Sequence, residues 1–201
     1  MITKEQKDSA IQTFKSFAAL LAEFPESEWK LLEEKFIVKE YAPEEVVLNE
    51  GDDAQYAYFV SKGLVECYYL TDAGDEMVYR FSKKSDFAAP TIALLTDSKA
   101  DCGIRAIEAS ILVGVDYIFW KKHLLDRHLC WDRAARRIFE LEFSVRSLRE
   151  KHFLILDTVK RYEFFKKNFP SFIDRIPQYK IASYLGVTPV TLSRAIQRIK
   201  P

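Results

Sequence analysis

The sequence predicts an α+β protein with a β-rich N-terminal part flanked by helices, one long helix, and a small all-α C-terminal part. Short apolar or alternating runs fill residues 37–118, a heptad repeat spans residues 131–155, and two short apolar-periodic stretches meet at a glycine within residues 178–200. With 201 residues, 48% of them apolar, the chain can bury a sizeable core.

The first segment has helical periodicity. Between Ser9 and Phe36, apolar residues recur at helical intervals, and Pro25 interrupts them. We therefore expect two short helices before the β-rich part.

The β-rich part runs from Ile37 to Ile118. Its runs VVLNEG, YAYFVSKG, LVECYYL, MVYRFS and SILVGVD are separated by Gly51, Gly63 and Gly74 in turn-like settings. The stretch TDAGDE (71–76) is the clearest hairpin loop. Many short strands with closely spaced turns predict a sandwich or a barrel.

A heptad repeat without Pro or Gly follows. Its seam comprises Trp131, Ala134, Ile138, Leu141, Val145, Leu148, His152 and Ile155. Such a seam is typical of a coiled coil, so we expect the helix to pair with that of a second copy, with His152 as a packed residue. A second apolar line, Phe139, Phe143 and Phe153, is expected to face the β-rich part. The alternative is a helix lying wholly on its own domain.

Charge is distributed unevenly along a chain whose formal net charge is zero. Residues 151–201 carry ten Lys and Arg against three Asp and Glu, whereas residues 1–150 carry 20 against 27. A basic C-terminal part attached to an acidic body indicates a polyanion as a partner.

Cysteine usage and hydropathy exclude several classes of protein. Cys67, Cys102 and Cys130 lie far apart without paired spacing, so we expect buried thiols and no disulfide framework, metal or iron–sulfur site. No apolar run resembles a signal peptide or approaches the length of a membrane span. The expectation is a soluble, cytoplasmic protein that does not enter the membrane.

The C-terminal stretch IASYLGVTPVTLSR predicts two helices joined by a sharp turn. Ile181 and Leu185 share one helix face, and Leu192, Ile196 and Ile199 share a face of the next helix. Gly186 suits the left-handed conformation that ends a helix, and Thr188 before Pro189 suits an N-cap followed by the first helical position. Ala182 is small enough to let the two helices cross closely.

This pattern is the sequence form of a helix-turn-helix, whose second helix enters the major groove of duplex DNA. Tight helix pairs also occur as plain packing units, but the local positive charge favours DNA binding. The candidate DNA-contacting residues are Thr188, Pro189, Val190, Thr191, Ser193, Arg194, Gln197, Arg198 and Lys200.

The stretch IPQYKIASYLGVTPVTLSR resembles the helix-turn-helix of the Crp/Fnr family of bacterial transcription regulators, in the form common among Bacteroidetes. Residues 46–87 resemble the family's β-roll, the cyclic-nucleotide-binding fold, and the heptad helix resembles its dimerisation helix. The resemblance implies a sensor domain at 1–125, a dimerisation helix at 126–156 and a DNA-binding domain at 157–201. It implies a homodimeric regulator rather than an enzyme, with duplex DNA as a partner and RNA polymerase as a further candidate.

The expected effector pocket departs from the family pattern. Nucleotide-binding members carry a Gly-Glu pair for the ribose and an Arg-Ser/Thr pair for the phosphate, where this chain has Ala89-Pro90 and Ala100-Asp101. Cyclic AMP is therefore not expected to bind unless Lys99 or Arg105 neutralises its phosphate instead. If the segment is a strand, Arg105 can instead pair with Asp101. The pocket residues are Phe87, Ala88, Ala89, Pro90, Thr91, Lys99, Ala100, Asp101 and Arg105.

Other departures bear on the alternatives. Pro189 and Val190 stand where the best-known members use Arg and Glu to contact bases, which leaves Arg194 as the candidate for a bidentate guanine contact. An oxygen-sensing cluster needs several cysteines near the N-terminus, whereas the first cysteine of this chain is Cys67. A haem needs an axial ligand, for which His123, His128 and His152 offer weak candidates. A cupin-like metal enzyme needs histidines on the strands, and none precedes His123. A ligand- or protein-binding module that has lost DNA binding is the remaining alternative.

Overall fold

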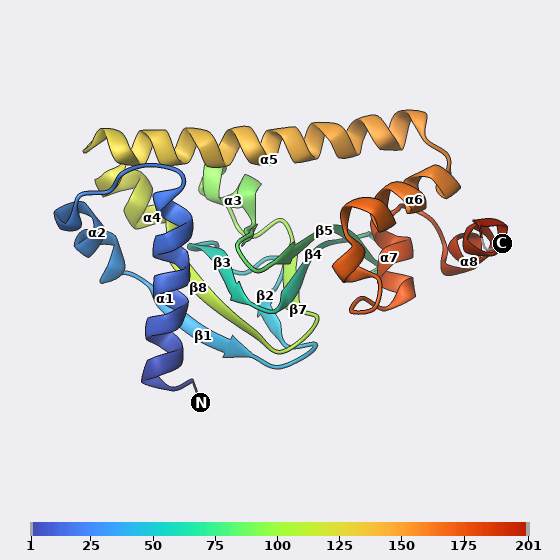
Figure 1. Cartoon of the computed structure of the whole chain (residues 1–201), viewed down its shortest axis with the longest axis horizontal. Coiled ribbons are helices and arrows are strands. Elements are labelled where there is room, and N and C mark those ends of the chain that lie inside the picture. Colours follow the sequence, from blue (N-terminus) through green and yellow to red (C-terminus); the bar gives the residue numbers. More distant parts are fainter. Residues whose placement is uncertain (1, 200–201) are drawn as a thin grey trace.

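The computed structural model of the chain describes residues 2–199 and confirms the α+β prediction (Figure 1). Helices α1 (Lys4–Ala19) and α2 (Glu26–Glu33) precede the strands, as the periodicity predicts. Helix α1 begins before Ser9 because Thr3 and Gln6 form a reciprocal capping box at its N-terminus.

The strands form two four-stranded antiparallel sheets within residues 2–199. One sheet has the order β1-β8-β3-β6 and the other β2-β7-β4-β5. Their bounds are β1 (Ile37–Tyr41), β2 (Val46–Leu48), β3 (Tyr56–Lys62), β4 (Leu64–Leu70), β5 (Glu76–Lys83), β6 (Phe87–Ala88), β7 (Gly103–Ala106) and β8 (Ser110–Asp116).

All five predicted strand runs are confirmed, and so is the 71–76 loop, which joins the antiparallel strands β4 and β5. The sequence pattern did not predict the short strands β1 and β6 or the short helix α3 (Thr91–Thr96), and it offered β7 only as a condition. Strand β6 and helix α3 are too short for a periodicity to develop, and β1 lacks hydrophobic alternation because Tyr41 is the one buried residue among its five. Gly63 takes φ +96° between β3 and β4, and a Cβ there would lie 2.2 Å from Ser110 Oγ.

Alternation along the strands supplies two apolar layers. On β3, Phe59 points outward to the N-terminal helices, while Tyr58 and Val60 point between the two sheets. The inter-sheet space is filled with buried side chains from both sheets and from the segment before β7: Tyr41, Leu48, Tyr58, Val60, Val65, Cys67, Ala88, Ala100, Ile104, Ala106 and Leu112. The roll is therefore a packed body on which helices lie.

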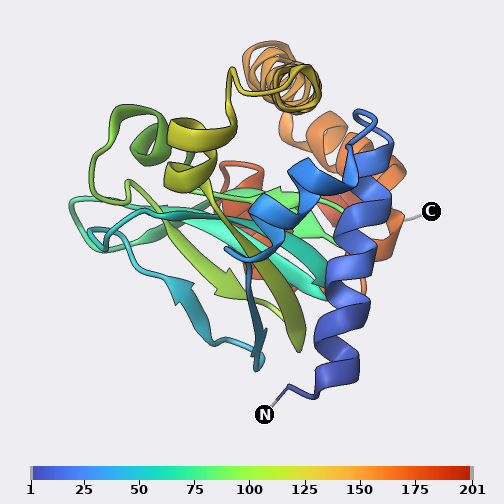
Figure 2. The same ribbon diagram turned by 90° about the vertical axis from the view of Figure 1, so that its left-hand side faces the viewer.

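The remaining helices continue from β8. The turn α4 (Tyr117–Phe119) and the π-helix η1 (Trp120–Leu124) lead into the long helix α5 (Leu129–Ile155). Helix α5 spans the whole body and reaches α6 (Thr158–Asn168), the 3₁₀ turn η2 (Pro170–Phe172), α7 (Gln178–Tyr184) and α8 (Pro189–Ile199) (Figure 1). Seen end-on, α5 lies above the sheets and α1 runs along their side (Figure 2).

The C-terminal helical unit, α6 to α8, packs on the outer face of β4 and β5. Buried Leu64, Tyr68, Val78 and Phe81 from the sheet share one core with apolar residues of the unit. All three cysteines are buried free thiols, as expected. None of the helices within residues 2–199 is long and apolar enough to cross a membrane.

Candidate functional site

Helices α7 and α8 meet at the turn that the sequence predicts. Gly186 has φ +68°, and the N–H of Val187 donates to the carbonyl of Ala182, which closes the end of α7. Thr188 Oγ1 accepts from the N–H of Thr191 at 3.1 Å, and Pro189 opens α8. Ala182 is fully buried. The local chemistry of these residues thus positions α8.

The outer face of α8 is open to solvent. Leu192 and Ala195 are buried, and Ile196 and Ile199 pack at the edge of the core. The predicted DNA-contacting residues within the described part are all exposed: Thr188, Pro189, Val190, Thr191, Ser193, Arg194, Gln197 and Arg198. Lys200 lies outside the described residues. This surface offers hydroxyls and two arginines on one helix.

Not all of the positive charge of the unit faces solvent. Lys180 is buried, and Arg175 pairs with Glu108 at the turn before β8 at 2.7 Å. Arg161 donates to the carbonyl of Leu185 at 2.7 Å and so caps α7. Besides the paired Arg175, the exposed cations among the described residues of this part are Lys151, Lys160, Lys166, Lys167, Arg194 and Arg198. The free positive surface is therefore smaller than the sequence count indicates.

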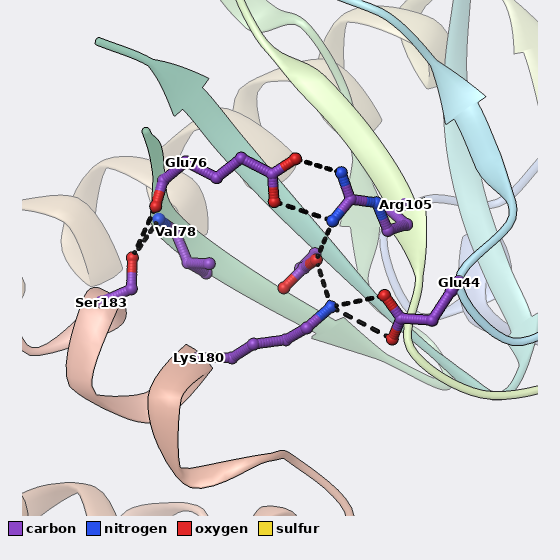
Figure 3. A network of polar contacts seen from close by, with 7 residues as sticks. Glu44, Glu76, Val78, Arg105, Lys180 and Ser183 are labelled. Atoms are coloured by element: carbon purple, nitrogen blue, oxygen red, sulfur yellow. Dashed lines mark hydrogen bonds and ion pairs between the residues drawn. The ribbon is translucent and has the colours of Figure 1, made fainter. Parts of the chain in front are cut away.

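A buried polar network joins the C-terminal helical unit to the roll (Figure 3). Lys180 Nζ on α7 donates to Glu66 Oε1 on β4 at 2.7 Å and to Glu44 at 3.0 Å. Ser183 Oγ accepts from the N–H of Val78 at 2.8 Å and donates to the carbonyl of Glu76 at 3.1 Å. The Ser183 contacts fix α7 against the edge strand β5, and the Lys180 contacts join it to β4 and to the segment before β2.

Glu66 and Lys180 are almost completely buried, at 0% and 2% exposure. Burial raises the pKa of Glu66, opposed by the neighbouring Lys180 and Arg105. Burial lowers the pKa of Lys180, but its bonds with Glu66 and Glu44 raise that pKa by more, so Lys180 stays charged. Sequence reasoning missed this pair, although a glutamate within the apolar run LVECYYL was a signal, because buried charges need partners.

Arg105 belongs to this network rather than to a pocket. Its guanidinium makes a bidentate pair with Glu76 and lies 3.5 Å from Glu66 Oε1. The alternative pairing of Arg105 with Asp101 is wrong, because Asp101 precedes β7 and Arg105 finds its acceptors on β4 and β5. One carboxylate oxygen of Asp101 is buried without a hydrogen-bond partner in the described part of the chain.

The other expected pocket residues do not form one cluster. Ala88 and Ala100 are buried between the sheets, and Pro90 is a buried residue at the start of α3. Lys99 lies on the surface and pairs with Asp53 at 2.6 Å. Phe87, Ala89 and Thr91 line a cavity between the N-terminal helices and α5 instead.

The long helix divides its apolar residues between two directions. Trp131 and Ala134 are buried in the chain's own core beside α1 and α2, which corrects their assignment to the seam. Trp131 Nε1 donates to Glu28 at 3.0 Å, and Ile138 packs at the edge of the same core. The seam residues that remain exposed are Leu141, Val145, Leu148 and Ile155.

The second apolar line behaves differently from the expectation. Phe143 is 73% exposed and Phe139 is exposed too, so neither is covered by the β-rich part. Phe153 faces the α7–α8 turn, where a Cβ on Gly186 would lie 2.6 Å from its ring. His152 packs on Phe164 of α6, with 3.9 Å between ring centroids. The end of α5 thus holds the C-terminal helical unit.

No group of three or more His, Cys, Asp or Glu within residues 2–199 is placed to hold a metal ion. His128 instead caps α5, accepting from the N–H of Cys130 at 3.2 Å, and the ring of His123 packs at a tilt on Phe119.

Comparison with known proteins finds a domain family and several solved structures that the chain resembles. Residues 38–123 match the model of the cyclic nucleotide-binding domain. Among solved structures, FixK2 from Bradyrhizobium japonicum has a TM-score of 0.66 at 20% identity, over 82% of this chain and 84% of that one. A Eubacterium rectale protein assigned to the Crp/Fnr family has a TM-score of 0.72 at 16% identity, over 87% and 83%.

The c-di-GMP-responsive global regulator CLP of Xanthomonas campestris has a TM-score of 0.65 at 16% identity, over 87% of this chain and 91% of CLP. The chain has the Crp/Fnr fold. No curated protein matches it by sequence. The Crp/Fnr fold expected from the resemblance is thus confirmed, and the Bacteroidetes form stays a prediction.

Proposed function

We propose that the protein is a homodimeric, DNA-binding transcription regulator of the Crp/Fnr type, acting in the cytoplasm. In this proposal residues 1–125 form the sensor domain, residues 126–156 the dimerisation helix and residues 157–201 the DNA-binding helix-turn-helix domain. The observation that carries it is α8: a capped helix, held by a small core, whose whole outer face is exposed and carries Arg194 and Arg198.

The rest of the chain supports the same proposal. The exposed cations Lys160, Lys166 and Lys167 on α6 add positive charge beside α8. The exposed apolar stripe on α5 is of the kind that marks a protein interface, and a dimer presents two recognition helices to two half-sites. A DNA-bound dimer would leave the body free to contact RNA polymerase.

Within the interface the side chains have different roles. Thr188 precedes the first residue of α8 and Thr191 lies in its first turn, and their hydroxyls share a hydrogen bond of 2.9 Å. Phosphate contacts are favourable at such a helix N-terminus. Arg194 is one turn further along and is the candidate for bidentate guanine recognition. Arg198 lies another turn along and suits a phosphate contact.

The test compares Arg194→Ala and Arg198→Ala in gel-shift titrations against specific and scrambled duplexes over a range of salt. Arg194→Ala should lose roughly 1–3 kcal/mol of discrimination at one base pair of each half-site, because a bidentate base contact is lost. Arg198→Ala should weaken binding to both duplexes and reduce the slope of log affinity against log salt by about 0.9.

Arg133→Ala is the matched control, because Arg133 is an exposed arginine on α5 away from α8. It should leave both affinities unchanged. If all three variants bind specific DNA as tightly as the wild type does, α8 is not the recognition helix, and the proposed function fails.

A further inference from the structure

An apolar cavity of about 280 Å³ lies between α5 and the N-terminal helices, outside the packed interior of the roll. Its deep end is lined by buried residues, among them Phe14, Trp29 and Leu32. Its mouth is lined by exposed residues, among them Leu95, Phe139 and Phe143. Figure 1 shows several of the elements that line it, α1, α2, α3 and α4, below the first half of α5. For scale, a dry cavity of about 150 Å³ holds a benzene molecule.

The mouth carries one cation without a carboxylate partner. Arg80 and Glu142 line the cavity but neutralise each other in a bidentate pair, and Arg80 Nε donates to Ser82 at 2.9 Å. Arg146 also lines it, and its guanidinium makes one hydrogen bond within residues 2–199, at 3.3 Å to Thr91 Oγ1. A cation at the rim of a hydrocarbon cavity is complementary to an acid with an apolar body.

The deep end carries one unused donor. Trp29 is 4% exposed, and its Nε1–H has no hydrogen-bond acceptor within the described residues. Buried N–H groups in folded proteins are nearly always paired, so this donor is free to bond an oxygen that an occupant of the cavity brings. By contrast, Trp131 on the same cavity has its partner in Glu28.

We propose that this cavity binds a medium-chain carboxylic acid whose carboxylate pairs with Arg146 and whose apolar end carries an acceptor oxygen for Trp29. The site is separate from the α8 surface, so the inference goes beyond the proposed function and does not depend on DNA binding. It shares Phe87, Ala89 and Thr91 with the expected nucleotide pocket, but it excludes Ala88 and Ala100, which are buried between the sheets.

The chain supplies its own reporters, because Trp29, Trp120 and Trp131, its three tryptophans, all line the cavity. The probes are decanoate, 9-oxodecanoate and decanol, titrated into the full chain and followed by tryptophan emission and calorimetry. We expect saturable binding with one site per chain. Decanoate should bind at least about fivefold tighter than decanol, and 9-oxodecanoate severalfold tighter than decanoate, because charged and buried hydrogen bonds each add affinity.

Three variants separate the contributions. Arg146→Gln should reduce the affinity for both acids toward that of decanol, whereas the control Arg133→Gln, on the same helix outside the cavity, should not. Trp29→Phe should remove the advantage of 9-oxodecanoate and keep decanoate binding, with the other two tryptophans reporting. Ala135→Phe, at a half-buried wall position, should block all probes while the melting temperature shows that the chain is folded.

Several results would overturn the proposal. Wild-type protein that binds no probe saturably has no such site, and binding that survives Ala135→Phe reports exposed apolar surface instead. Equal affinities for decanoate and decanol would show that Arg146 does not pair with the carboxylate. If light scattering shows that decanoate splits a dimer in step with the emission change, a second copy of the chain covers the cavity. DNA binding by α8 is measured separately and can fail independently.

Discussion

Single side chains decide what the roll can bind. Ala88 and Ala100 are buried among the apolar residues that fill the space between the sheets. A cyclic phosphate placed there would lose its hydration without gaining a cation. Lys99 lies on the surface and pairs with Asp53, and Arg105 on β7 pairs with Glu76 on β5, across strand β4. Lys99 and Arg105, which could have replaced the missing arginine, are thus already paired with carboxylates outside this space.

We therefore predict that cyclic AMP does not bind. Isothermal calorimetry with the nucleotide up to millimolar concentration should give no saturable heat, and the melting temperature should not rise, because a ligand that binds only the folded chain would raise it. A double variant, Ala89→Gly with Pro90→Glu, tests the ribose side and should not restore binding without a phosphate cation. Micromolar affinity of the wild type would contradict this account of the roll.

At the scale of elements, α5 packs within its own chain at both ends and leaves an apolar stripe exposed in its middle. Its first turns bury Trp131 and Ala134 under α1 and α2, and its last turns hold the α7–α8 turn through Phe153. Its middle leaves Leu141 at 57% and Val145 at 56% exposure. A helix anchored at both ends presents a straight apolar stripe, which is what a coiled-coil partner needs.

If the protein is the proposed dimer, the variant Leu141→Glu with Val145→Glu should convert it to a monomer. Two carboxylates buried in a seam without partners cost several kcal/mol, so the dissociation constant should rise at least about 100-fold. Sedimentation at micromolar concentration measures it. Leu70→Glu, at an exposed leucine at the end of β4, is the control and should stay dimeric. A wild-type monomer, or a charged variant that remains a dimer, would rule out this seam.

At the scale of the whole molecule, the buried Lys180–Glu66 pair sets how the C-terminal helical unit sits on the roll. The pair is not fully satisfied, because Glu66 Oε2 has no hydrogen-bond partner in the described chain. Incompletely bonded buried pairs add little net stability, yet removing one partner leaves an isolated buried charge. We therefore expect the pair to specify one position of the unit more than it strengthens the fold.

Lys180→Met should destabilise the chain by roughly 3–5 kcal/mol in urea unfolding, because Glu66 loses its main partner. The double variant Lys180→Met with Glu66→Met should recover most of that loss, since no charge stays buried. Lys166→Met, an exposed lysine on α6, should change stability by no more than about 0.5 kcal/mol. If Lys180→Met is as mild as Lys166→Met, the unit does not dock on the roll in this way.

The pH dependence of the same contact follows from the raised pKa of Lys180. A lysine whose pKa is higher in the folded chain than in the unfolded chain contributes its full stabilisation at neutral pH. That contribution is lost only as the pH rises through the folded-state pKa. The docked arrangement is therefore insensitive to pH near neutrality as far as Lys180 is concerned.

The sequence by itself determined the strand runs, the 71–76 hairpin, the long helix and the Gly186–Thr188–Pro189 turn. Each of these follows from local chemistry, such as alternation, heptad spacing, left-handed glycine or an N-cap, which acts between residues a few positions apart. Tertiary structure alone decided that Trp131 is core rather than seam, that Arg105 and Lys180 pair with Glu76 and Glu66, and where the cavity lies. Those partners are separated by 29 positions or more along the chain, and no local pattern records which distant side chain will cover a buried charge or an apolar face.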